Sequence, residues 1–399
     1  MIGTLTIDYY KLNARKKDEC LGLFVCMYLL LDAVNSMLQD VFRISGGTLK
    51  LTRCIIALAL VVFLVNGLAH FNKRDWSTLI IWEFVGVACY VYSYFVGASV
   101  SKLIGWAGTT LAVCVPIAVF TYLIEDKTVL YEQFRKFSWI ILAVLVIDMV
   151  GTKEDLYNIH FTYAVLFCML FHFNELVNGN KRVLHFVVLC IELMMVLMYG
   201  SRGGLVCLAA FMLIKVFFGV KDAKITVKYS ILFLFAIVAL GVILFFGNDI
   251  YKFLKSIGIY SRSLRLILQG KFASHDSGRG VLYDTVRSLI MQKPLTGWGI
   301  RGSVSVLGHP YPHQFFYDCV LTFGIPMGTC MIIALCLPMV KVFTTKSGLN
   351  RDMLQMFFSI GFVALMFMNT LFTDYYYFIF VGLIASNYGE RKYKLRFRS

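Results

Sequence analysis

Long apolar runs fill almost the whole of this 399-residue chain. A helix needs about 20 apolar residues to cross the hydrocarbon core of a bilayer, and about twelve runs approach that length. They occupy residues 20–39, 51–70, 78–96, 103–124, 137–150, 157–177, 183–199, 203–220, 227–247, 315–340, 353–372 and 375–388. Closed β-barrels also span membranes, but their strands alternate apolar and polar residues, whereas these runs are apolar on every face. The runs predict an all-α, polytopic integral membrane protein with 10–12 transmembrane helices, of which the fifth and the last are short.

Lysine and arginine gather in alternate connections between the predicted helices. If the amino terminus is cytoplasmic, 23 of the 38 basic residues lie inside and six lie in short outside connections, while nine fall in the interval 248–312. The positive-inside rule therefore predicts that both termini are cytoplasmic and that this interval is extracytoplasmic. Because the basic residues are spread over short loops, the net charge of +15 does not indicate a nucleic-acid partner.

The predicted topology divides the chain into three zones. Residues 1–247 hold nine transmembrane helices, residues 248–312 form an extracytoplasmic loop with short amphipathic helices, and residues 313–399 hold three transmembrane helices and a basic cytoplasmic tail. Within the loop, residues 251–272 alternate basic and apolar side chains. This pattern fits an amphipathic helix on the outer leaflet, or equally one packed on the outer surface of the protein.

The second half of the loop predicts another helix, which begins near Gly278 and ends before Pro294. Arg279, Tyr283 and Arg287 are spaced four residues apart and therefore share one face of that helix. Proline disfavours helix at the residue before it, so the helix ends there.

Six side chains in or near the loop can carry chemistry. They are Arg202, Arg279, Arg287, Arg301, His309 and His313. Guanidinium groups bind phosphate and pyrophosphate, and histidine exchanges a proton near neutral pH. Structural roles stay open: an interfacial arginine can reach lipid headgroups, and an interfacial histidine can bond to backbone.

No metal and no cofactor are expected. The eleven cysteines contain no C-x-x-C pair, and most lie inside predicted spans, where they act as small apolar side chains. His309 and His313 are four residues apart, but the prolines between them prevent a helical metal-binding pair.

Two stretches resemble segments of the O-antigen ligase/polymerase superfamily. Ser201-Arg202-Gly203-Gly204 is similar to its S-R-G-[AG] segment. The stretch 279–328 is similar to its signature of an arginine, an amphipathic helix, P-L-x-G-x-G, a variable loop, and H-[NSQ] followed by glycine. In this chain these elements are Arg279, P-L-T-G-W-G at 294–299, His313-Gln314 and Gly324. The resemblance covers about a third of the chain, and it departs from the common pattern in having Gln314 for asparagine and three residues between Gly324 and Gly328.

The resemblance implies glycosyl transfer on the outer face of a bacterial cytoplasmic membrane. The implied donor is a glycan on undecaprenyl diphosphate, and a polymerase moves the growing chain onto a new lipid-linked repeat unit. A ligase would instead move the finished glycan onto a lipid A core sugar. We favour the polymerase because polymerases serve O-antigen, capsule and exopolysaccharide, whereas the ligase requires lipid A. The expected partners are the lipid-linked oligosaccharide, the bilayer, a chain-length regulator and a flippase.

The resemblance also gives the candidate residues roles in a metal-independent, inverting transfer. Arg202 and Arg279 would hold the diphosphate, and His313 would accept the proton of the acceptor hydroxyl. The remaining candidates for substrate contact are Arg287, Arg301, Tyr283, Trp298, Tyr311 and Gln314.

Two other classes of function remain. A transporter of lipid-linked glycan or solute would use intramembrane carboxylates such as Glu83 and Glu192 as relays, and paired halves with matching broken helices would support it. No such repeat is evident in the sequence. A non-catalytic membrane assembly factor gives no reason for Arg202, Arg279 and His313 to occur together.

Overall fold

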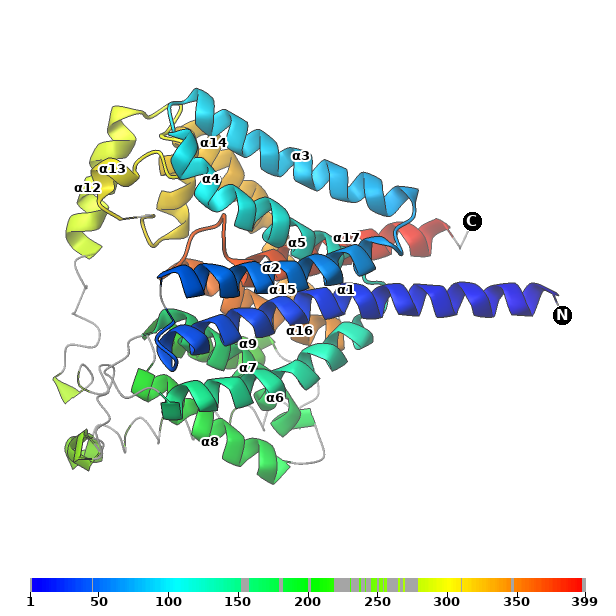
Figure 1. Cartoon of the computed structure of the whole chain (residues 1–399), viewed down its shortest axis with the longest axis horizontal. Coiled ribbons are helices and arrows are strands. Elements are labelled where there is room, and N and C mark those ends of the chain that lie inside the picture. Colours follow the sequence, from blue (N-terminus) through cyan, green and yellow to red (C-terminus); the bar gives the residue numbers. More distant parts are fainter. Residues whose placement is uncertain are drawn as a thin grey trace. The chain divides into compact units, whose positions relative to one another are not determined.

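A computed structural model of the protein describes most of the chain as helix (Figure 1). The described residues are 2–44, 46–151, 158–178, 182–199, 202–218, 279–309, 311–345 and 348–396, with isolated short pieces between 230 and 269. No β-strand occurs within these ranges. The predicted span 227–247 and the predicted amphipathic helix 251–272 lie largely outside the described residues, so both stay predictions.

The chain forms two compact units, each assembled from three separate segments. The first unit contains Met1–His70, Ile124–His275 and Ser347–Met356, and the second contains Phe71–Leu123, Asp276–Lys346 and Phe357–Ser399.

The first unit is a bundle of long apolar helices. Its helices are α1 (Ile2–Asp40), α2 (Gly46–Leu68), α6 (Lys127–Gly151), α7 (Ile159–Asn178), α8 (Arg182–Tyr199), α9 (Arg202–Phe218) and most of α16 (Leu349–Phe357). Helix α1 packs on α2, α6 and α7, and α7 packs on α8 and α9. Gly204 allows the α7–α9 approach, because a Cβ there would lie 2.5 Å from Cγ2 of Thr162. Across α7 and α8, His172 Nδ1 and Glu192 Oε1 are 2.7 Å apart and fully buried, a polar contact of the kind that joins membrane helices.

The second unit combines long apolar helices with short, interrupted ones. Its elements are α3 (Lys73–Phe95), α4 (Val100–Thr109), η1 (Thr110–Cys114), α5 (Val115–Leu123), α12 (Arg279–Gln292), α13 (Val304–Leu307), α14 (Phe315–Cys336), η2 (Leu337–Met339), α15 (Val340–Thr344), η3 (Phe358–Val363) and α17 (Tyr375–Arg396). Helix α17 packs on α5 and η3, and α12 packs on α14.

Several helices have the length and composition needed to cross a membrane. Within the described part of the chain there are six such candidates: Ala14–Asp40, Leu51–Leu68, Lys73–Phe95, Val100–Leu123, Ile159–Val177 and Phe315–Thr344. Gly203–Phe218 and Tyr375–Asn387 are shorter apolar helices. These elements fit a polytopic membrane protein with an all-helical fold.

Two predicted spans differ in length from the helices that the structure shows at those positions. Helix α6 has 25 residues, because it begins at Lys127, ten residues before the predicted fifth span 137–150. The predicted span 353–372 stops being helical after Leu365, and the backbone runs irregularly until Asp374. Hydrogen bonds to the carboxylates of Asp318 and Asp374 hold the backbone in this irregular conformation.

Helix α12 covers the predicted range and buries one face. Leu282, Val286, Leu289 and Ile290 are buried there and form a cluster with residues of α13 and α14. Their i, i+4, i+7 and i+8 spacing is that of an apolar stripe on an amphipathic helix. The opposite surface therefore presents the predicted polar face to the surroundings.

The turn after α12 docks on a break inside α14. Gly324 has φ 78° and ψ 172°, which interrupts α14. The backbone N–H groups of Trp298 and Gly299 donate to the carbonyls of Leu321 and Thr322 at 2.8 and 2.9 Å. These bonds hold the P-L-T-G-W-G segment in a fixed backbone pairing.

Glycine is needed on both sides of this pairing. Gly297 has φ +66°, and a Cβ on it would lie 2.5 Å from Thr322 O; a Cβ on Gly324 would lie 2.4 Å from Leu295 O. Both contacts are with backbone, which cannot move away without breaking the pairing.

Replacing Gly324 by alanine should therefore destabilise the protein strongly. A positive φ combined with ψ 172° is almost restricted to glycine and costs a residue with a Cβ about 1–3 kcal/mol, and the clash adds about 1–3 kcal/mol. The matched control is Gly308→Ala, since Gly308 also has a positive φ of 69° but a Cβ there meets nothing within 4 Å. Thermal unfolding in detergent should show a clearly larger loss for Gly324→Ala, and equal losses would contradict the clash.

Candidate functional site

Arg279 stands at the first residue of α12, with its guanidinium half-buried. Its Nη2 donates a hydrogen bond of 3.0 Å to the carbonyl of Phe367, in the irregular segment before α17. The carbonyl is uncharged, and Arg279 forms no ion pair with a carboxylate in the part of the chain that the structure describes. Arg279 is therefore positioned by the fold while its charge remains available to an anion.

His313 lies directly before α14 and has a left-handed backbone, with φ +57°. The next residue, Gln314, caps α14 by accepting a hydrogen bond of 2.7 Å from the backbone N–H of Tyr317. This cap gives a local reason for a side chain with a hydrogen-bond acceptor after the histidine.

The surroundings of His313 favour its neutral form. Burial, the positive charge of Arg279 and the charge of His309 lower the pKa of His313 to about 4. Desolvation and a nearby cation both penalise the imidazolium. The imidazole is therefore neutral at physiological pH, so one ring nitrogen is unprotonated, but the lowered pKa also makes it a weaker base than an ordinary histidine.

Tyr311 links His313 to a helix far away in sequence. Its ring meets that of His313 edge to face with centroids 4.4 Å apart, and it meets Trp106 of α4 at 6.1 Å. Burial and the carboxylates of Asp318 and Asp374 raise the pKa of the Tyr311 hydroxyl. The phenol therefore stays protonated.

Two buried carboxylates that we did not predict from sequence hold the irregular segment. Asp318 Oδ2 accepts hydrogen bonds from Thr370 Oγ1 at 2.6 Å and from the N–H of Leu371 at 3.3 Å. Asp374 accepts from the amide of Asn369 at 2.8 Å and from the N–H of Tyr377 at 2.9 Å. The aspartate before an apolar run is the one signal that could have indicated Asp374, as a helix N-cap.

Left-handed backbone conformations gather in this region. Four non-glycine residues of the described chain have positive φ: Arg43, Arg301, His313 and Asn369. The last three belong to the second unit, and the backbone of Asn369 hydrogen-bonds to Tyr311. Such conformations cost energy and cluster at functional sites, which supports a site around His313.

Arg287 and Tyr283 lie on the polar face of α12, as their spacing predicted. Arg287 donates to the hydroxyl of Tyr317 at 3.0 Å and pairs with Asp284 at 3.0 Å, and the bond to Tyr317 raises the pKa of the exposed guanidinium. The rings of Tyr283 and Tyr317 are 5.3 Å apart.

Trp298 and Arg301 make mainly intramolecular contacts. The indole N–H of Trp298 donates to Leu289 O at 2.8 Å, and Lys293 Nζ lies 4.5 Å from its ring centroid. Arg301 Nη1 donates to Lys102 O at 3.4 Å, and its guanidinium lies 4.9 Å from the centre of the Trp106 ring.

Arg202 is the first residue of α9 and belongs to the first unit. Its side chain lies outside the described set, so its proposed contact with a diphosphate stays a prediction.

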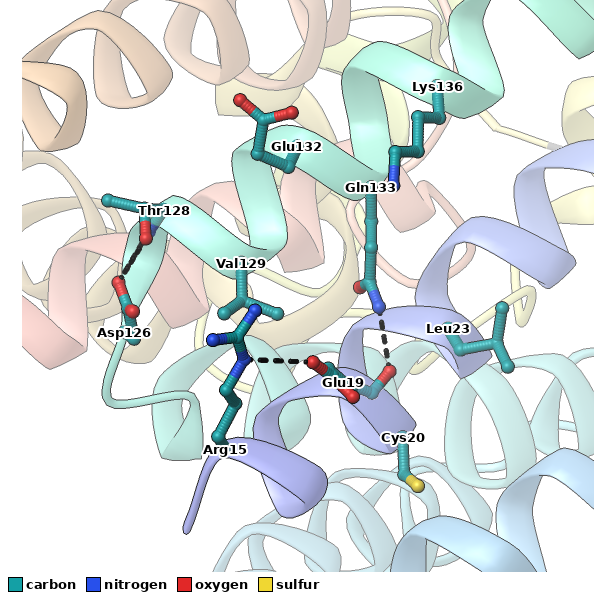
Figure 2. A pocket seen from close by; sticks show the side chains of 10 residues that line it. All are labelled: Arg15, Glu19, Cys20, Leu23, Asp126, Thr128, Val129, Glu132, Gln133 and Lys136. Carbon is teal, nitrogen blue, oxygen red and sulfur yellow. Dashed lines mark hydrogen bonds and ion pairs between the residues drawn. The ribbon is translucent and has the colours of Figure 1, made fainter. Parts of the chain in front are cut away.

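A polar pocket of about 540 Å³ opens between α1 and the start of α6 (Figure 2). Its lining includes Arg15, Glu19 and Gln133. Arg15 Nε donates to Glu19 at 3.1 Å, and Gln133 Nε2 donates to the carbonyl of Glu19 at 2.8 Å. The pocket contains none of the residues that we predicted for the site.

The described residues contain no group of three or more histidine, cysteine, aspartate or glutamate side chains that could bind a metal ion. The positive groups near His313 are arginine and histidine side chains.

Part of the chain is similar to a known protein family. No curated protein and no solved structure is detectably similar to the chain. Residues 184–332, which include Arg202, Arg279 and His313, match the family model described as O-Antigen ligase. This match supports the resemblance of the chain to the O-antigen ligase/polymerase superfamily.

Proposed function

We propose that the protein is a polysaccharide polymerase that transfers a glycan from undecaprenyl diphosphate to a lipid-linked repeat unit. The family match supports a role in membrane glycan transfer, and the apolar helices support a membrane location. The observation that carries the proposal is that Arg279 and His313 lie in one unit, close enough for the charge of Arg279 to lower the pKa of His313. A cation and a neutral proton acceptor are the two groups that such a transfer needs.

The proposed reaction is a direct displacement. The acceptor hydroxyl oxygen forms a bond to the anomeric carbon of the donor, and the bond from that carbon to the diphosphate oxygen breaks. The electron pair of the broken bond stays on the diphosphate, where Arg279 and Arg202 stabilise the negative charge. The proton of the hydroxyl passes to a ring nitrogen of His313. Because the attack comes from the side opposite the leaving group, the anomeric configuration inverts.

The distribution of lysine and arginine supports an extracytoplasmic site. In the predicted topology both termini are cytoplasmic, and α12 and His313 lie at the outer face of a bacterial cytoplasmic membrane. There the enzyme would receive lipid-linked repeat units from a flippase and act with a chain-length regulator.

The surface polysaccharide of a deletion strain distinguishes the polymerase from a ligase. Gel electrophoresis should show only a single repeat unit on its anchor, with polymer restored by the wild-type gene. Accumulation of undecaprenyl-linked polymer that is not attached to lipid A would indicate the ligase. Unchanged polysaccharide would contradict both enzymes and favour the transporter or assembly-factor classes.

Glycan transfer by the purified protein should not depend on a divalent metal ion. Arginine charges can stabilise the leaving diphosphate, so transfer should proceed at an unchanged rate after EDTA treatment. The assay is the formation of lipid-linked polymer in proteoliposomes with and without chelator. A loss that added Mg²⁺ or Mn²⁺ reverses would contradict the proposed role of the arginines.

A further inference from the structure

Trp106 brings helix α4 into contact with the loop that carries His313. Its ring lies 4.9 Å from the guanidinium carbon of Arg301 and 6.1 Å from the ring of Tyr311. The Tyr311 ring in turn lies 4.4 Å from that of His313. Arg301, Trp106, Tyr311 and His313 therefore form a continuous series of flat side chains, which we call the aromatic row.

The fold maintains the aromatic row at some energetic cost. Arg301 and His313, its two ends, both have left-handed backbones, with φ of +57° each. Gly105 leaves space for Arg301, because a Cβ there would lie 2.9 Å from Nη1 of that arginine. A cation against an aromatic face attracts the ring by about 0.5–2 kcal/mol, so Arg301 fixes the orientation of Trp106.

The aromatic row also has exposed surface. Trp106, Tyr311 and His313 are each only partly buried. Trp298 is also partly buried, but it packs against the cluster between α12 and α14 and uses its indole N–H within the fold.

We propose that Trp106 and Tyr311 form a stacking platform for a pyranose ring of the lipid-linked glycan, with His313 at its reactive end. This inference rests on the proposed function. Sugar rings have apolar C–H faces that pack against flat aromatic side chains, and Trp and Tyr provide large apolar faces with a polar group at one edge. A sugar on this platform lies beside the group that accepts the proton.

The platform joins a residue of the family segment to one outside it. Tyr311 lies within residues 184–332, which match the family model, whereas Trp106 does not. A substitution at residue 106 can therefore change which sugar is bound while Arg279 and His313 keep their contacts. Trp106 is accordingly a specificity-determining residue in this proposal.

The test compares the affinities of two lipids for the purified protein in nanodiscs. One probe is undecaprenyl diphosphate, and the other is the lipid-linked oligosaccharide extracted from the membranes of a deletion strain. The variants are Trp106→Ala, Trp106→Phe and Arg279→Ala. Trp82→Ala is the matched control, since Trp82 is a partly buried tryptophan that stacks on Tyr122 at 6.4 Å.

Trp106→Ala should weaken binding of the lipid-linked oligosaccharide by about threefold to tenfold and leave binding of undecaprenyl diphosphate unchanged. Trp106→Phe should keep most of the affinity, and Trp82→Ala should resemble the wild type with both probes. Equal affinities of Trp106→Ala and wild type for the oligosaccharide would overturn the platform. An equal loss with both probes would also overturn it, because Trp106 would then act on the fold or on the diphosphate.

The Arg279→Ala variant distinguishes a failure of the platform from a failure of the proposed function. This variant should bind undecaprenyl diphosphate more weakly than the wild type. Unchanged binding would remove the diphosphate role of Arg279 whatever the Trp106 variants do, and a wild type that binds neither probe would overturn both proposals.

Discussion

Replacing Arg279 by alanine should abolish long-chain glycan while the protein remains inserted in the membrane. Removing a preorganised group that stabilises developing negative charge typically lowers a rate by about 10²–10³. Arg279 is held by a 3.0 Å hydrogen bond to Phe367 O, so its charge is fixed in place before substrate arrives. Complementation of a deletion strain, followed by gel analysis of the polysaccharide, measures this effect.

A lysine at this position should restore only part of the activity. Lysine keeps the charge, but it cannot present the planar pair of donors that binds phosphate oxygens. Arg53→Ala is a suitable control, because Arg53 is an exposed arginine of α2 in the first unit. Membrane levels of all variants should be equal by immunoblotting. Polymer of normal length from the Arg279→Ala protein would contradict the diphosphate role.

Periodicity in the sequence was enough to predict α12 but not the break before α17. The helix has a local origin, since its apolar stripe, its polar face and Pro294 are all visible in the sequence. The break depends on partners distant in the chain: Asp318 of α14 binds Thr370, and Asn369 adopts a left-handed conformation. A run such as M-F-M-N-T-L-F-T looks like the end of an apolar helix, so hydropathy alone extended the span to residue 372.

The candidate site was predictable where a short motif carries it. The signature led to Arg279 and His313, and the fold brings both to one unit, where the charge of Arg279 lowers the pKa of His313. The motif did not indicate that Gly297 and Gly324 serve a fixed backbone pairing, because that pairing depends on contacts between segments distant in the chain. Trp106 gave no signal, because a tryptophan inside an apolar run resembles any residue packed among helices.

Replacing His313 by alanine should lower the rate of transfer by about 10²–10⁴, the usual contribution of a positioned proton acceptor. His309→Gln is the matched control, since His309 is an exposed histidine whose ring centroid lies 6.1 Å from that of His313. The control should retain most of the wild-type rate. The measurement is polymer formation by purified proteins in proteoliposomes under single-turnover conditions.

The pH dependence tests the same role in the wild-type enzyme. Because the pKa of His313 is lowered to about 4, the imidazole is already neutral at pH 5.5, and activity should fall only as the pH approaches 4. An ordinary histidine would give an acid limb near pH 6.5.

The depressed pKa of His313 also affects stability. Between pH 6.5 and 4 the imidazole binds a proton in the unfolded protein but not in the folded one, so this histidine destabilises the fold as the pH falls through that window. His313→Ala should therefore lose activity at every pH yet lose less stability than wild type between pH 6.5 and 5. If the variant kept its activity, or if the wild-type acid limb lay near 6.5, the neutral proton acceptor assigned to His313 would be wrong.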